Sequence, residues 1–178
     1  MPTTINPTRD PLEEKLRTFV EGLLGGKVTA MQRLLRWRPA WNLELQRDGE
    51  TLQLHIRGER GGDVSPFPDL RREADILTLL GQQGVPVPRI YGFCEDPQAI
   101  VMELVPGSRD VSTANDDAER VGVARQWVDA MARMHQLPLQ PFIDQGIGLP
   151  KGAEDITLAG LEAYYPLYAR NKTKAQPL

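Results

Sequence analysis

The chain contains a single cysteine, Cys94, among its 178 residues. One cysteine cannot form an internal disulfide, so a disulfide-stabilised secreted fold is excluded and a reducing cytoplasm is the expected location. The first residues, MPTTINPTRDPLEEK, have neither a basic nor an apolar segment, so we expect no secretory signal there. No apolar run approaches the ~18 residues of a membrane-spanning helix, so we expect no membrane partner.

The sequence also lacks an excess of basic residues. Its 21 Lys and Arg are outnumbered by 24 Asp and Glu, which gives a net charge of −3. Proteins that bind nucleic acid are usually basic, so this balance argues against a nucleic-acid partner. The hydrophobic fraction of 40% is ordinary for a globular protein, and the length suits one domain or two small lobes.

The first predicted element is a helix over residues 10–24, after nine residues without an apolar period. Asp10 is suited to be its N-cap, Pro11 its first residue, and Glu13 the third position of a capping box. Two glycines follow and are expected to end the helix. Its apolar stripe consists of Leu12, Leu16, Phe19, Val20, Leu23 and Leu24.

Residues 27–58 predict three strands, and Asp48-Gly49 is a hairpin turn between the last two. Side chains alternate between the two faces of a strand. His55 and Arg57 therefore face the side opposite Leu54 and its apolar neighbours. Residues 58–68 are expected to form a loop.

A second helix is predicted to begin at Leu70 and to end near residues 81–84. Glu73 lies on its apolar stripe with Leu77 and Leu80. A buried carboxylate costs free energy unless a cation or several donors meet it. Two interpretations are open: Glu73 reaches solvent at the edge of the stripe, or it pairs with a basic residue from another element.

The rest of the chain predicts two more strands, at residues 89–93 and 99–105, and then a polar linker. A helix follows from about Asp117 to His135, with Trp127 and Val128 on its apolar stripe. Residues 136–152 read as loop, and the tail has helical character with a break near Pro166. This order predicts an α+β fold, an antiparallel sheet of about five strands with a helix packed on it.

Three stretches, in this order, resemble the protein-kinase-like fold and most closely the aminoglycoside phosphotransferase family of small-molecule kinases. They are LHIRG followed by LRREADILTLL, then GVPVPRIYGFCEDPQAIVMELVPG, then MARMHQLP. The resemblance implies a kinase-like N-lobe followed by the first helices of a truncated C-lobe. It divides the chain into an N-terminal segment and helix (1–26), a nucleotide-binding N-lobe (27–106), and a linker with a partial helical C-lobe (107–178).

The resemblance implies roles for Arg57 and Glu73. In kinase-like folds a strand lysine pairs with a helix glutamate and holds the ATP phosphates, and these two residues stand at those positions. We therefore expect their side chains to lie within about 4 Å. Arginine in place of lysine is a departure, because a planar guanidinium is not a compact ammonium charge. The alternative is that they are two unrelated surface charges.

The resemblance also implies a hinge at Glu103, Leu104 and Val105, whose backbone N–H and C=O groups would contact adenine. The alternative is an ordinary core strand. His55 stands where kinases commonly keep a small residue against the adenine ring. It either reshapes the pocket and stacks on the base, or is a strand histidine bonded to a neighbour.

The segment Leu34–Leu45 contains no glycine, although a loop that cradles phosphate usually needs one for close backbone approach. Three interpretations are open for it. Its side chains hold phosphates, it is a basic and aromatic patch for nucleic acid, or it is a covering turn. The residues concerned are Arg36, Trp37, Arg38 and Trp41.

The catalytic motifs of the family are missing. Its members use His-Gly-Asp with an Asn five residues after the Asp, and a later Asp that binds Mg²⁺. His55 precedes Ile and His135 precedes Gln, so neither begins this motif. His135 reads as a core histidine, and Asp144 and Asp155 match neither metal-binding signature. We expect the Mg²⁺ ligands to lie outside this chain, which by itself is expected to be nearly inactive.

Two hypotheses follow. The chain is the ATP-binding part of a Mg²⁺-dependent phosphotransferase acting on a small-molecule hydroxyl, or it is a non-catalytic module that binds a nucleotide or a partner. An exposed apolar surface beside the C-terminal helices favours the first, and a charged surface there favours the second. The sequence indicates neither the acceptor nor the oligomeric state.

Overall fold

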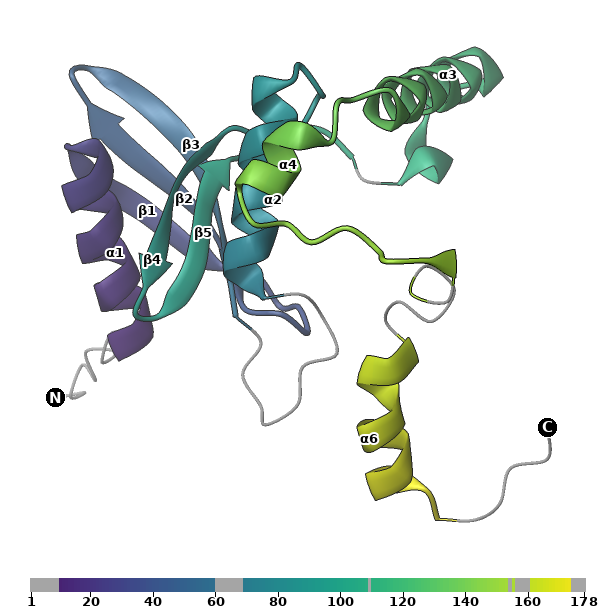
Figure 1. Cartoon of the computed structure of the whole chain (residues 1–178). Helices are drawn as coiled ribbons and strands as arrows, with labels where there is room; N and C mark the ends of the chain where they lie inside the picture. Colours follow the sequence, from purple (N-terminus) through teal and green to yellow (C-terminus); the bar gives the residue numbers. More distant parts are fainter. Residues whose placement is uncertain (1–9, 60–68, 109, 154, 156–160, 174–178) are drawn as a thin grey trace, which may run out of the picture.

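The computed structural model describes residues 10–59, 69–108, 110–153, 155 and 161–173. The predicted loose start and most of the predicted loop at residues 58–68 lie outside these ranges. The described chain forms an α+β fold with one five-stranded antiparallel sheet (Figure 1), as predicted. This is the arrangement expected of a kinase-like N-lobe.

The strands follow the order β1-β2-β3-β5-β4 across the sheet. Their bounds are β1 Lys27–Arg33, β2 Ala40–Arg47, β3 Glu50–Gly58, β4 Ile90–Glu95 and β5 Gln98–Glu103. The β2–β3 hairpin turns at Asp48 and Gly49, which both have positive φ, 52° and 83°. Asp-Gly favours this turn because Gly adopts positive φ without strain and Asp tolerates it.

Helix α1, Pro11–Leu24, packs on one face of the sheet. Asp10 caps it by accepting a hydrogen bond of 3.0 Å from the Leu12 N–H. The Glu13 carboxylate, predicted to belong to a capping box, instead accepts a 2.9 Å hydrogen bond from the indole N–H of Trp41. This contact ties the first turn of α1 to β2.

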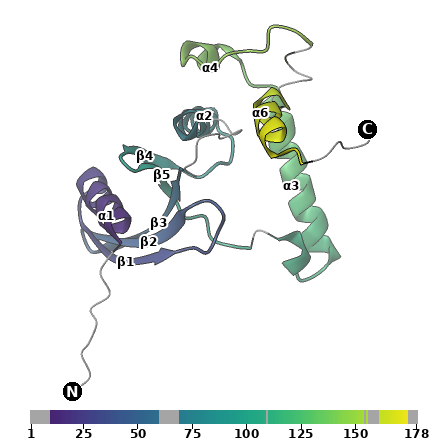
Figure 2. The same ribbon diagram turned by 90° about the horizontal axis from the view of Figure 1, so that it is seen from below.

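Two apolar clusters cover the two faces of the sheet. The larger one lies under α1, and the smaller one lies under α2, Leu70–Gln82. Figure 2 shows the sheet curving around α1, with α2 on the outer face. Alternation along β3 sends Leu54 and Ile56 into the larger cluster and therefore sends His55 and Arg57 toward the α2 side. Helix α1 thus shares the main core with the sheet.

The C-terminal part contains η1 Val111–Thr113, α3 Asp117–His135, α4 Gln140–Asp144 and α6 Leu161–Asn171. Helix α3 has the predicted bounds but no buried side chain, and it stands clear of the sheet in Figures 1 and 2. Its apolar stripe is therefore exposed, and His135, predicted to be a core residue, is exposed with it.

Two predictions for this part were wrong in detail. Residues 136–152, predicted as loop, contain the short helix α4, which lies against α2. The helix α6 runs through Pro166 without the predicted break. Proline has no backbone N–H, so the helix lacks one hydrogen bond there, and the hydrogen bonds of the neighbouring residues maintain it.

Candidate functional site

Arg57 and Glu73 lie side by side on the α2 face of the sheet. The Nε atom of Arg57 is 2.9 Å from Oε1 of Glu73, which confirms the predicted proximity. Arg57 comes from the end of β3 and Glu73 from the first turn of α2. The two residues therefore connect a central strand to the helix that covers it.

A second arginine meets the same carboxylate. Nη1 of Arg38 donates a hydrogen bond of 3.0 Å to Oε2 of Glu73, and only 15% of the Arg38 side chain and 26% of the Glu73 side chain are exposed. Arg38 comes from the connection between β1 and β2. Of the two interpretations of Glu73, the structure supports pairing, because two guanidinium groups hold its two oxygens. The sequence offered Arg38 as a phosphate ligand, as part of a nucleic-acid patch or as part of a covering turn, and did not indicate that it pairs with Glu73.

Positive charge exceeds negative charge around Arg57. Burial lowers the pKa of Arg57, the Glu73 carboxylate raises it, and the charges of Arg38 and Arg36 lower it again. The side chain remains a cation at neutral pH because the ordinary pKa of arginine is so high. Its Nε–H is shielded from solvent and lacks an aligned acceptor, despite the short distance to Glu73. Two guanidinium groups thus contact the Glu73 carboxylate, and the charge of a third, Arg36, also acts on Arg57.

A cleft of about 470 Å³ lies next to this cluster. Arg57 and Glu73 do not line it, but Arg57 follows His55 by two residues on the same face of β3. The structure therefore places His55 and the predicted hinge around one cavity. Among the residues that line it are Arg36, His55, Met102, Glu103, Leu104 and Val105.

The backbone of the predicted hinge is partly engaged already. The N–H of Glu103 donates to Arg89 O at 2.8 Å, and the N–H of Leu104 donates to Gln53 O at 3.1 Å. Within the described part of the chain the N–H of Val105 makes no such bond. Of the three hinge N–H groups, that of Val105 is therefore the one left for a ligand.

His55 is held by its neighbour on β2. Its Nδ1 lies 2.8 Å from Oδ1 of Asn42, the residue directly opposite in the β2–β3 register. Burial lowers the pKa of His55, and the charges of Arg36 and Arg57 lower it further. The imidazole is therefore neutral at pH 7. It is a strand histidine with a bonded neighbour, and it also lines the cleft.

The glycine-free segment Leu34–Leu45 divides into three parts. Trp41 is only 1% exposed and belongs to the core, so its inclusion in a phosphate-binding or nucleic-acid patch was wrong. Alternation along β2 explains this, because Trp41 shares the α1 face with Leu43. Trp37 is largely exposed, whereas Arg36 and Arg38 lie beside the cleft and Glu73.

Neither a metal site nor a membrane span is seen in the part of the chain that the structure describes. That part holds no cluster of three or more His, Cys, Asp or Glu able to bind a metal ion. In the same residues no helix is long and apolar enough to cross a membrane. The expectation that Mg²⁺ ligands lie elsewhere stays a prediction.

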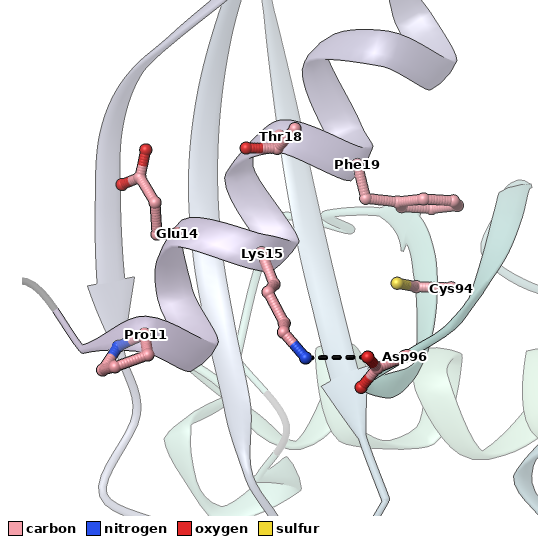
Figure 3. A pocket seen from close by; sticks show the side chains of 7 residues that line it. All are labelled: Pro11, Glu14, Lys15, Thr18, Phe19, Cys94 and Asp96. Atoms are coloured by element: carbon pink, nitrogen blue, oxygen red, sulfur yellow. Dashed lines mark hydrogen bonds and ion pairs between the residues drawn. The ribbon is translucent and has the colours of Figure 1, made fainter.

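A larger hollow of about 820 Å³ lies on the other side of the sheet, between α1 and the end of β4. Figure 3 shows Lys15 and Asp96 joined by an ion pair, which measures 2.7 Å, with Cys94 drawn above Asp96. Cys94 is buried, and burial raises the pKa of its thiol, so it is not a ready nucleophile. We therefore assign Cys94 no catalytic role in this hollow.

Three comparisons with known proteins bear on this site. Residues 57–176 match the model of the phosphotransferase enzyme family, APH. Acyl-CoA dehydrogenase family member 10 of Mus musculus is 27% identical over 164 residues, which are 82% of this chain and 15% of that protein. The chain thus spans about a seventh of that relative's length.

A solved structure is similar over part of the chain. A crystal structure assigned to a fructosamine-3-kinase of Thermobifida fusca shows 23% identity and a TM-score of 0.40, covering 53% of this chain and 32% of the other. A similarity at this level does not define a substrate. The family match includes both Arg57 and Glu73.

Proposed function

The chain belongs to the phosphotransferase enzyme family, and we propose on that basis that it binds ATP in the cleft beside His55 and residues 103–105. The reaction proposed for the protein is transfer of the γ-phosphoryl group to the hydroxyl of a small molecule. The observation that carries this proposal is the ion pair of Glu73 with Arg57, two residues along β3 from His55, which lines that cleft. A strand cation held by a helix carboxylate is the arrangement that positions ATP phosphates in kinase-like folds.

The cleft fits a nucleotide in two ways. Its lining includes His55 and Met102, whose side chains can contact a base, and the Val105 N–H is available as a donor. A base seated there would direct its phosphates along β3 toward Arg57. The family's Mg²⁺ would join the phosphates from ligands outside the described residues, so we assign it no step here.

The exposed stripe of α3 bears on the alternative, a non-catalytic binding module. Val121, Trp127 and Val128 are all exposed on this helix. An apolar surface of this kind is typical of a helix that packs against further structure. It favours the interpretation that the chain is the nucleotide-binding part of a phosphotransferase.

The first experiment is a calorimetric titration of the 178-residue chain with Mg-ATP, beside Arg57→Ala. We expect the wild type to bind and the variant to bind roughly 10- to 100-fold more weakly, the range for one charged hydrogen bond. Circular dichroism establishes that both chains are folded. A folded wild type that does not bind ATP would contradict the proposal.

A second pair of variants tests the hinge. Val105→Pro removes the one hinge N–H that is left for a ligand, and Val105→Ala keeps it. We expect the proline variant to bind adenosine at least about fivefold more weakly, as for one lost neutral hydrogen bond, and the alanine variant to bind nearly as the wild type does. If both variants bind adenosine equally well, the N–H of Val105 does not contact the ligand.

A further inference from the structure

The connection between β1 and β2, residues 34–39, lies where a phosphate-binding loop would cover the nucleotide, yet it has no glycine and two of its backbone N–H groups are already bonded. A phosphate loop presents free N–H groups to the anion, and glycine lets the backbone approach closely. Here the N–H of Leu34 donates to Ala40 O at 2.8 Å, and that of Arg36 donates to Leu34 O at 2.9 Å. These two N–H groups are therefore not available to a phosphate.

The same connection instead carries two arginine side chains toward the site. Arg36 lines the cleft, and its guanidinium makes no hydrogen bond or ion pair with any described residue. Arg38 donates a hydrogen bond to one carboxylate oxygen of Glu73, and Arg57 lies next to the other oxygen. Arg36, Arg38 and Arg57 together with the Glu73 carboxylate carry a surplus of two positive charges next to the cleft, which Arg36 lines.

We propose that Arg36 and Arg38 are the ligands of the nucleotide's terminal phosphates and take the place of backbone N–H groups from a glycine-rich loop. Guanidinium groups suit this role because their fork of N–H donors matches two phosphate oxygens. Arg36 binds without giving up a partner. Arg38 exchanges Glu73 Oε2 for phosphate oxygen, while Glu73 keeps Arg57.

This exchange is possible because Glu73 holds its two arginines through different oxygens. When Arg38 leaves, the carboxylate remains neutralised by Arg57, so no unpaired charge is left behind. In the absence of nucleotide the same hydrogen bond keeps the β1–β2 connection against α2. The proposal rests on the proposed function in that it assigns the anion to the nucleotide.

The test is a calorimetric titration of the full chain with three ligands: ATP, adenosine and sodium tripolyphosphate, at fixed ionic strength. The variants are Arg36→Ala and Arg38→Ala, with Arg33→Ala as the matched control. Arg33 carries the same charge on the same part of the chain but pairs with Asp10 at 3.4 Å, next to α1. Arg38→Lys keeps the charge without the fork and is included in case Arg38→Ala is unstable.

We expect Arg36→Ala and Arg38→Ala each to weaken the binding of ATP and of tripolyphosphate roughly 10- to 100-fold, which is the range for a lost charged hydrogen bond. The affinity for adenosine should be unchanged. Arg33→Ala should change the binding of all three ligands by less than about twofold, because Arg33 does not line the cleft and its guanidinium is paired with Asp10. The proposal is overturned if Arg36→Ala and whichever Arg38 variant is folded bind ATP as the wild type does.

The ligands also separate this inference from the proposed function. If adenosine binds as tightly as ATP, the phosphates contribute nothing to binding. This result would contradict the role of Arg36 and Arg38 and would support binding of the nucleoside in the cleft. Arginine-dependent binding of tripolyphosphate, with no binding of ATP or adenosine, would support the anion site and contradict the nucleotide assignment. A folded chain that binds none of the three overturns both.

Discussion

Arg38 and Glu73 are joined by a hydrogen bond of 3.0 Å between Nη1 and Oε2. The bond links the β1–β2 connection to the first turn of α2, and most of both side chains is removed from solvent. The other oxygen of Glu73 lies against Arg57. One carboxylate therefore links the β1–β2 connection and β3 to α2.

Removing this carboxylate is expected to destabilise the fold. Glu73→Ala leaves two partly buried guanidinium groups without their anion and should lower the free energy of unfolding by about 1–2 kcal/mol, the lower part of the usual range because Arg57 is partly exposed. Urea unfolding measures the change. Asp129→Ala, on the exposed surface of α3, is the control. A Glu73 variant as stable as this control would show that the network contributes nothing to the fold.

The contact between Trp41 and Glu13 gives a second stability prediction. Trp41→Phe keeps a buried aromatic ring but removes the N–H that Glu13 accepts at 2.9 Å, and should cost about 1–2 kcal/mol. Trp127→Phe is the matched control, since Trp127 is 64% exposed and its replacement should cost less than about 0.5 kcal/mol. Similar losses in both variants would mean that the stripe of α3 is covered in solution.

Two glycines near the junction of α1 and β1 are expected to respond in opposite directions. Gly26 has a φ of 95°, and a Cβ there would lie 2.2 Å from Gln46 O, so Gly26→Ala should destabilise by about 1–3 kcal/mol. A Cβ on Gly22, inside α1, would meet open space, so Gly22→Ala should stabilise by about 0.5–1 kcal/mol. Thermal unfolding measures both, and a neutral Gly26→Ala would show that the chain relaxes at this point.

The elements that the sequence predicts best are those specified by neighbouring residues. Asp10, the Asp48-Gly49 turn and the bounds of α3 follow from capping residues and from apolar period. That Arg57 and Glu73 meet was implied by the family resemblance, whereas strand alternation and helical period indicated only that Arg57 faces away from Leu54 and that Glu73 lies on the apolar stripe of its helix. Their assignment to a nucleotide came from the family resemblance and is not tested by the geometry alone.

What the sequence could not predict depends on the path of irregular segments. Residues 34–39 have no period, so nothing local indicates that Arg38 reaches Glu73. The hydrogen bond from Leu104 to Gln53 O likewise depends on how β5 leaves the sheet. The burial of His135 was wrongly predicted because an apolar stripe indicates which face is fit for packing and does not show what packs there.

His55 gives a prediction about pH. Its pKa is lowered in the folded protein, chiefly by burial, whereas the unfolded chain has the ordinary value of about 6.5. Between these two values the unfolded state binds more protons, so the contribution of His55 to stability is complete above about pH 6.5 and is lost as pH falls toward the folded value.

The measurement is urea unfolding of the wild type and of His55→Gln between about pH 5 and 8. The glutamine keeps a donor for Asn42 but does not titrate in this range. We expect the wild type to lose stability relative to His55→Gln as the pH is lowered, and the difference to be constant above about pH 7. His135→Gln, at an exposed position, is the control and should follow the wild type. A constant difference between wild type and His55→Gln at every pH would mean that His55 takes up a proton as readily in the folded protein as in the unfolded chain, and that its ring is open to water.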